Sequence, residues 1–300
     1  MARTNTTSIY DTITNKIIEA LEHGTEKFSL PWHRSTSPLS RPVNAVSKNA
    51  YRGVNILALW ASAEAQDFGH GLWATYRQWQ SLGAQVRKGE KASPIVFYKV
   101  LDKREDEKNE EDESPGRIFA RASHVFNVSQ VEGYDIPDTP EGEEFDPIPQ
   151  VQAFVERTGA SVRIQGESAH YTPSTDTISM PDRERFFTTA SGSAGENWYA
   201  TLLHELVHWS GADHRLARKF GKRFGDEAYA MEELVAELGS AFLCGDLGLS
   251  TRPRPDHASY LANWLKVLKA DNRAIFTAAS AATKAAEFLS GDKCKKGKDE

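Results

Sequence analysis

The chain has 300 residues, of which 39% are hydrophobic, 26% charged and 10% aromatic. This composition is typical of a folded soluble protein and excludes disordered and collagen-like classes. At roughly 100–200 residues per domain, the length predicts two domains. The formal net charge of −6, taken alone, argues against a protein that binds nucleic acid.

Cysteine content and hydropathy indicate where the protein works. The chain has only two cysteines, Cys244 and Cys294, which excludes a disulfide framework and a thiolate metal cluster. No run approaches 18 consecutive apolar residues, and the polar N-terminus has no signal-peptide core. We therefore expect a cytoplasmic protein that does not span a membrane.

The first half of the chain is predicted to be α+β. An apolar repeat from Ile9 to Leu21, ending near Gly24, predicts a helix, and further helices are expected over 55–66 and 75–82. Runs of β-branched and aromatic residues over 94–100 and 118–128 predict a hairpin. The hairpin encloses a segment, 102–113, in which eleven of twelve residues are charged, so that segment is expected to be a solvated loop.

A second domain is expected after a proline-rich segment. Four prolines and six acidic residues between Asp135 and Pro149 predict an extended linker. The expected organisation is a first domain over 1–135, a linker over 136–149, a second domain over 150–290 and a charged tail over 291–300. The second domain is expected to be mostly helical, with a small sheet. Its predicted elements are an apolar periodic segment over 151–157, strands over 162–164, 169–171 and 177–180, and helices over 193–210, 226–248, 256–270 and 272–289.

A metal-binding motif lies on the helix that ends at Gly211. This helix opens with a capping box, Ser193-x-x-Glu196, and contains His204-Glu205-Leu206-Val207-His208. Two histidines four residues apart project from the same face and can bind one cation. The glutamate between them can hold a metal-bound water without being a ligand. The pattern predicts a catalytic zinc site with Glu205 as general acid and base in peptide hydrolysis.

A third ligand has to come from elsewhere, because catalytic zinc normally takes three protein ligands and a water. The helix over 226–248 offers Glu233 and Glu237, which share a face among apolar residues where an unpaired carboxylate would be costly. One of the two is the expected ligand. His214 is a weaker alternative, because it and Asp213 follow the Gly211 break too closely. If the site were absent, the histidines would be ordinary hydrogen-bonded residues and the glutamates a solvated helix face.

The charge is distributed unevenly along the chain. Residues 27–99 contain ten Lys/Arg and three Asp/Glu, a balance of +7, so the remainder carries −13. Basic side chains beside aromatic rings suit single-stranded nucleic acid, because cations follow phosphates while bases stack on rings. Trp60 and Trp79 lie on apolar helix faces and are expected to be core residues. The candidate DNA contacts are Trp32, Arg34, Lys48, Tyr51, Arg52, Asn55, Trp73, Tyr76, Arg77, Arg87, Lys88 and Lys91.

These motifs resemble a known family over about residues 9–290. The patterns Tyr51-Arg52-Gly53-x-Asn55, Trp73-x-Thr75-Tyr76-x-x-Trp79 and Val86-Arg87-Lys88-Gly89-Glu90 are similar to the N-terminal domain of the plasmid ArdC antirestriction family. A similar domain occurs in conjugation-associated primases. The patterns Tyr171-x-Pro173-x-x-Asp176 and His204-Glu205-Leu206-Val207-His208-Trp209 resemble that family's zincin-like metallopeptidase domain.

The resemblance implies a function and a ligand set. It implies a protein that binds single-stranded DNA and protects incoming conjugative plasmid DNA from host restriction. The metal ligands would be His204 and His208, and Glu205 would be catalytic. The E-x-x-A pattern of related zincins points to Glu233 as third ligand, with Glu237 supporting a histidine. The metal would be Zn²⁺ or another divalent cation such as Mn²⁺.

Two other functions are also considered. The protein could be an active zinc metalloprotease that cleaves host proteins such as restriction subunits. Alternatively, it could coat DNA and carry a structural or vestigial metal site. An intact Glu205 favours activity, because a structural zinc needs no base beside it.

Overall fold

The computed structural model describes residues 9–27, 41–66, 68–101, 117–136, 148–186, 188, 192–219, 227–249 and 257–291. Two candidate DNA contacts, Trp32 and Arg34, lie outside these ranges. So do the charged loop, most of the predicted linker and residues 292–300. The elements in chain order are α1 (Ile9–Lys27), β1 (Val43–Asn44), α2 (Val54–Ala65), β2 (Leu72–Ala74), α3 (Tyr76–Ser81), β3 (Gln85–Val86), β4 (Ser93–Leu101), β5 (Arg117–Asn127), β6 (Val131–Glu132), α4 (Ile148–Thr158), β7 (Ser161–Ile164), β8 (His170–Thr172), β9 (Thr177–Met180), α5 (Ala194–Ser210), α6 (Glu227–Leu247), α7 (His257–Ala270) and α8 (Ala274–Ser290).

The predicted α+β class is confirmed, and the predicted helices and hairpin all form within a few residues of their expected bounds. The sequence did not predict β1, β2, β3 and β6. Each of these strands has two or three residues, too few to show the alternation by which a strand is recognised.

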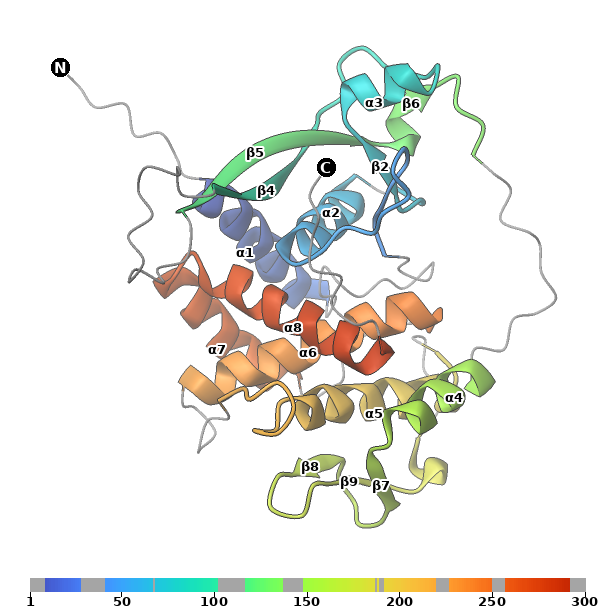
Figure 1. Ribbon diagram of the computed structural model, residues 1–300, viewed down its shortest axis with the longest axis vertical. Helices are drawn as coiled ribbons and strands as arrows, with labels where there is room; N and C mark the ends of the chain where they lie inside the picture. Colours follow the sequence, from blue (N-terminus) through green and yellow to red (C-terminus); the bar gives the residue numbers. More distant parts are fainter. Residues whose placement is uncertain are drawn as a thin grey trace, which may run out of the picture.

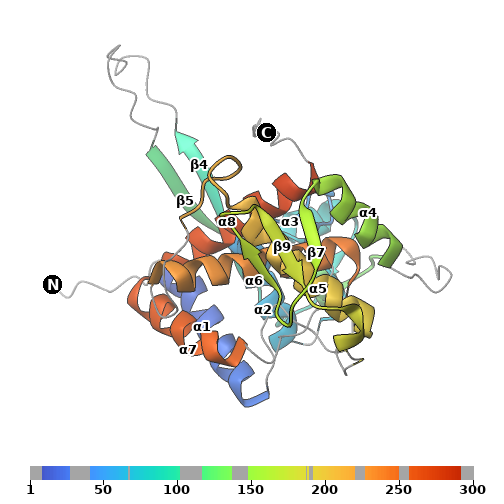
Figure 2. The same cartoon turned by 90° about the horizontal axis from the view of Figure 1, so that it is seen from below.

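A four-stranded sheet organises the first half of the chain. Its order is β1-β2-β5-β4, with β1 and β2 parallel and the other pairs antiparallel. The hairpin of β4 and β5 arches over α2 in Figure 1 and projects from the body in Figure 2. The Asn55 side chain joins α2 to β4, because it donates to the Val96 carbonyl and accepts from the Val96 amide, both at 2.8 Å.

Helices α4 to α8 and a three-stranded sheet make up the second half. The sheet has the order β7-β9-β8, with β9 parallel to β7 and antiparallel to β8. It lies against α5 at the opposite end of the molecule from the β4–β5 hairpin (Figure 1). Helix α6 packs against both α5 and α8. None of the helices in the described ranges is long and apolar enough to cross a bilayer.

The two halves share a continuous hydrophobic core. Its buried residues extend from α1 and α2 to α5, α6, α7 and α8. Trp60 on α2 packs against Phe242 on α6 with ring centroids 5.7 Å apart, and Thr14 on α1 donates to the Asn272 carbonyl at 2.6 Å. Helices of the first half therefore hold helices of the second half in place. The domain boundary within 136–149 stays a prediction.

Candidate metal centre

Helix α5 carries both histidines of the motif, and its ends are fixed as the sequence predicts. The capping box forms: Glu196 Oε2 accepts from the Ser193 amide at 2.7 Å, and Ser193 Oγ accepts from the Glu196 amide at 3.2 Å. At the other end, the Gly211 amide donates to the His208 carbonyl at 2.8 Å. Most of the helix between these ends is buried, so its histidines face other elements instead of solvent.

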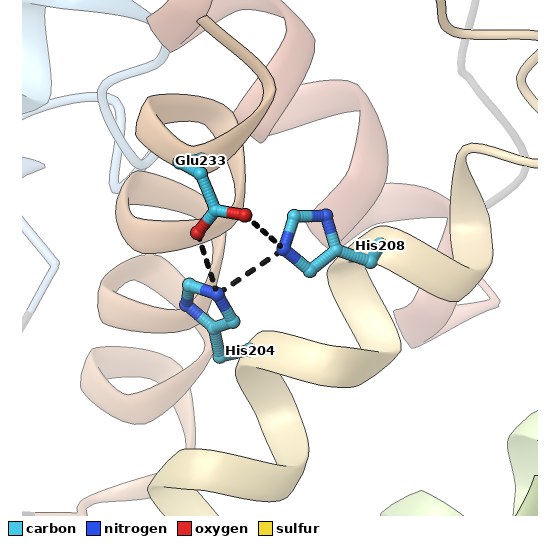
Figure 3. Close-up of side chains that lie close together, drawn as sticks. All are labelled: His204, His208 and Glu233. Carbon is cyan, nitrogen blue, oxygen red and sulfur yellow. Dashed lines mark hydrogen bonds and ion pairs between the residues drawn. The ribbon is translucent and has the colours of Figure 1, made fainter. Parts of the chain in front are cut away.

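Three side chains from two helices meet at one point, as Figure 3 shows. His204 and His208 project from α5, and Glu233 projects toward them from α6. The two imidazole Nε2 atoms are 3.2 Å apart, and each lies 3.5 Å from one oxygen of the Glu233 carboxylate. Zinc-to-nitrogen bonds of about 2.0–2.1 Å in a tetrahedral site imply ligand atoms about 3.4 Å apart. The spacing of these donor atoms therefore fits one divalent cation.

The protonation of Glu233 suits a ligand. Burial alone would raise the pKa of its carboxyl group, but the hydrogen bond from His204 and the charges of His208 and His204 outweigh burial and lower the pKa to about 2. Tyr229, one helical turn earlier on α6, also donates a hydrogen bond to this carboxylate. Glu233 is therefore ionised at neutral pH, as a metal ligand has to be.

Two further glutamates of α6 face the outer nitrogens of the imidazoles. Glu237 Oε2 lies 3.8 Å from His204 Nδ1, on the side of the ring where the predicted supporting residue belongs. Glu232 Oε1 lies 3.2 Å from His208 Nδ1. Burial would lower the pKa of His208, but the hydrogen bond with Glu232 and the nearby charge of Glu233 raise it overall.

Sequence reasoning missed the role of Glu232. The signal was present, because three glutamates within six residues of a buried helix each need a partner. The sequence does not show that Glu232 pairs with His208. Glu232 directly precedes the ligand candidate Glu233, and adjacent residues point to different sides of an isolated helix.

Glu205 and His214 occupy different environments. Glu205 is 5% exposed on α5, between the two histidines, and its charge acts on His208. The His214 side chain is 64% exposed, with its Nε2 atom 3.5 Å from Asp176 Oδ2. The structure brings neither His214 nor Asp213 to the group formed by the two histidines and Glu233.

The structure corrects three of the predicted DNA contacts. Trp73 is 1% exposed in β2 and packs against Phe68 in a T-shaped pair, so it offers no face to a base. Tyr51 is buried and its hydroxyl accepts a hydrogen bond from Asn44. The Asn55 side chain already makes two hydrogen bonds with the Val96 backbone. The two-residue and three-residue elements around Tyr51 and Trp73 show no periodicity that would predict their burial, and the pairing of Asn55 with β4 is a long-range contact that no local pattern predicts.

Most of the other described candidates are on the surface, and three of them line one groove. Lys48, Arg52, Arg77 and Lys91 are exposed, and Arg52 pairs with Glu287. A groove of about 520 Å³ is lined by Tyr76, Gln85, Val86, Arg87, Lys88, Glu90, Phe126 and Glu132. The Tyr76 ring is 42% exposed and meets Phe126 edge to face, with centroids 6.4 Å apart.

Comparison with known proteins identifies both halves. Residues 7–126 match the family described as the N-terminal domain of anti-restriction factor ArdC, and residues 149–281 match the zincin-like metallopeptidase family. The y4eC protein of Sinorhizobium fredii is 47% identical over 287 residues, which cover 94% of this chain and 92% of y4eC. DNA primase TraC of Escherichia coli is 33% identical over 300 residues, but the chain spans only 27% of that primase.

Solved structures agree with this assignment. The crystal structure of the metal-free antirestriction protein ArdC from plasmid R388 matches with a TM-score of 0.74 at 36% identity, covering 94% of this chain and 96% of that one. The Mn(II)-bound structure of the same protein matches with a TM-score of 0.75 at 35% identity, covering 97% and 100%. The relative whose structure matches this chain therefore binds a divalent metal ion.

Proposed function

The chain belongs to the ArdC antirestriction family, and from that premise we propose that it binds single-stranded DNA and protects incoming plasmid DNA from host restriction in the cytoplasm. We propose further that its zincin-like half binds a divalent cation through His204, His208 and Glu233. The observation that carries the metal site is the convergence of these three donor groups at tetrahedral spacing.

The metal site supports hydrolytic chemistry. Zn²⁺ or Mn²⁺ held there would supply a Lewis acid and would lower the pKa of a bound water. Glu205, buried on α5 and between the two ligand histidines in sequence, would serve as the general base and acid of peptide hydrolysis. A second candidate function follows, namely cleavage of host proteins such as restriction subunits. The burial of an intact acid beside the ligands favours it, since a structural metal needs no base.

The groove beside α3 is the proposed DNA contact. The exposed ring of Tyr76 and the neighbouring Phe126 offer aromatic surface for an unpaired base, and stacking of this kind tolerates any base. Lys88 lines the same groove, while Arg77 and Lys91 lie nearby in sequence and are exposed. Arg87 is partly neutralised by its ion pair with Glu90. The cations would hold phosphates, so binding should weaken steeply as salt concentration rises.

A restriction-protection assay in a conjugation recipient separates the two activities. The variants are Glu205→Gln, the pair Tyr76→Ala with Lys88→Ala, and Lys266→Ala on α7 as a charge-matched control away from the groove. Loss of protection only in the groove variant would reject an obligatory protease mechanism. Loss only in Glu205→Gln would reject simple DNA coating. Full protection in both would overturn the proposed function.

A further inference from the structure

One arginine of the loop that follows α5, Arg218, contacts a glutamate beside the metal centre. Arg218 donates from Nε and Nη2 to the Glu232 carboxylate at 3.0 and 2.8 Å. Its Nη1 donates to Ser210 Oγ at 3.0 Å, and its Nη2 also donates to the Val207 carbonyl. The side chains of Arg218 and Glu232 are 12% and 6% exposed. This largely buried guanidinium thus ties the C-terminal end of α5 to α6.

The same Glu232 carboxylate also contacts a ligand histidine, His208. Glu232 Oε1, which accepts from Arg218, also lies 3.2 Å from His208 Nδ1. When Nδ1–H donates to that oxygen, the lone pair of the ring remains on Nε2. This is the atom that faces Glu233 and His204. The contacts form an ordered chain from Arg218 through Glu232 to the metal-facing nitrogen of His208.

The two ligand histidines are held differently. The 3.8 Å between His204 Nδ1 and Glu237 is too long for a hydrogen bond, and among the described residues this nitrogen has no hydrogen-bond partner. His208 has its partner within hydrogen-bond distance, and that partner is itself held by the fork of Arg218. A carboxylate behind a ligand histidine fixes the tautomer and the ring orientation and makes the ligand more basic. His208 is therefore the histidine whose orientation is fixed before metal arrives.

We propose that Arg218 and Glu232 are positioning residues that hold His208 for the metal and thereby set metal affinity. This inference rests on the proposed metal centre. Glu232 fixes the tautomer and orientation of the ring, and Arg218 holds the Glu232 carboxylate in place. Because Arg218 uses a planar fork on the carboxylate and on α5 at once, lysine cannot replace it even though the charge is kept.

The test is Mn²⁺ binding to the full chain after removal of metal with a chelator, measured by calorimetric titration. The variants are Glu232→Gln, which keeps the side-chain volume, and Arg218→Lys, which keeps the charge. Asp176→Asn is the matched control, because Asp176 holds the same loop through Arg215 at a site distant in sequence from the metal ligands. The melting temperature of each metal-free variant reports whether it is folded. The absorption spectrum of the Co²⁺-loaded protein reports the geometry at the metal, which a merely structural change in the loop would not alter.

Glu232→Gln should weaken Mn²⁺ binding by roughly 10–100-fold and change the Co²⁺ spectrum. Arg218→Lys should also weaken Mn²⁺ binding and change the Co²⁺ spectrum in the same direction. It tests the proposal by itself if Glu232→Gln does not fold. The control should bind Mn²⁺ within about twofold of wild type. Wild-type affinity in folded Glu232→Gln and Arg218→Lys would overturn the inference, and so would an equal loss in Asp176→Asn. A wild-type chain that binds no Mn²⁺ would instead overturn the proposed metal centre, and the inference with it.

Discussion

A close contact between α5 and α6 controls the geometry of the metal centre, and it depends on Gly239. A methyl group at Gly239 would lie 2.9 Å from Cγ2 and 3.0 Å from Cγ1 of Val207, inside the 3.4–4 Å of ordinary contact. Val207 cannot rotate away, because a β-branched residue in a helix has one strongly preferred rotamer. Gly239→Ala therefore has to separate the helices locally by about half an ångström, the difference between 2.9 and 3.4 Å.

The expected cost follows from two opposing terms. Overpacking a core contact costs about 1–3 kcal/mol, whereas alanine favours a helix over glycine by about 1 kcal/mol, so stability should fall by about 0–2 kcal/mol. The effect of Gly239→Ala on metal affinity should be clearer than its effect on stability. Gly239 lies about 9 Å along α6 from Glu233, at 1.5 Å per residue, and Val207 directly precedes His208. Ligand positions need to be accurate to about 0.5 Å, and we expect Mn²⁺ affinity to fall about tenfold, or about 1.4 kcal/mol.

A double-mutant cycle gives the measurement. Thermal unfolding and Mn²⁺ titration are compared for Gly239→Ala, Val207→Ala and the double variant. Removing the two Val207 methyl groups makes room for the new one, so the double variant should recover most of the affinity that Gly239→Ala loses, a non-additive result expected of residues in contact. If Gly239→Ala melted higher than wild type and bound Mn²⁺ equally well, this contact would not set the distance between the ligands.

Three further outcomes follow from single side chains. The hydrogen bond from Arg215 outweighs partial burial and lowers the pKa of Asp176 from 3.8 to about 2. The ionised Asp176 therefore contributes stability above pH 3.8, and this contribution is lost as the pH falls toward 2. Urea unfolding across that range should show a shallower pH dependence of stability in Asp176→Asn than in wild type. Ser193→Ala removes the α5 cap and should cost about 1 kcal/mol in urea unfolding, and an unchanged midpoint would show that the cap contributes nothing. Burial raises the pKa of the Cys244 thiol, so in a Cys294→Ser background a thiol reagent should modify Cys244 only after unfolding, and rapid labelling of the folded protein would contradict its burial.

The elements that the sequence predicts well depend on neighbours close along the chain. The capping box at Ser193 and the pairing of His204 with His208 are i, i+3 and i, i+4 relations that any α-helix produces. The β4–β5 hairpin is likewise local, because its strands are consecutive and show the expected β-branched and aromatic runs. For such features the sequence is sufficient, and it predicts both the motif and the helix that presents it.

Long-range contacts decided the rest. Helix geometry alone leaves Glu233 and Glu237 equivalent, and within the sequence only the resemblance to related zincins points to Glu233. The packing of α6 on α5 brings Glu233 to both imidazole Nε2 atoms. The same packing gave His208 its partner Glu232, and the sheet around β2 buried Trp73, which composition had marked as a base-stacking residue. Burial and metal geometry are properties of side chains brought together from distant positions. No local sequence pattern encodes those distances. The sequence therefore indicates the type of chemistry, and the tertiary structure determines which residues can perform it.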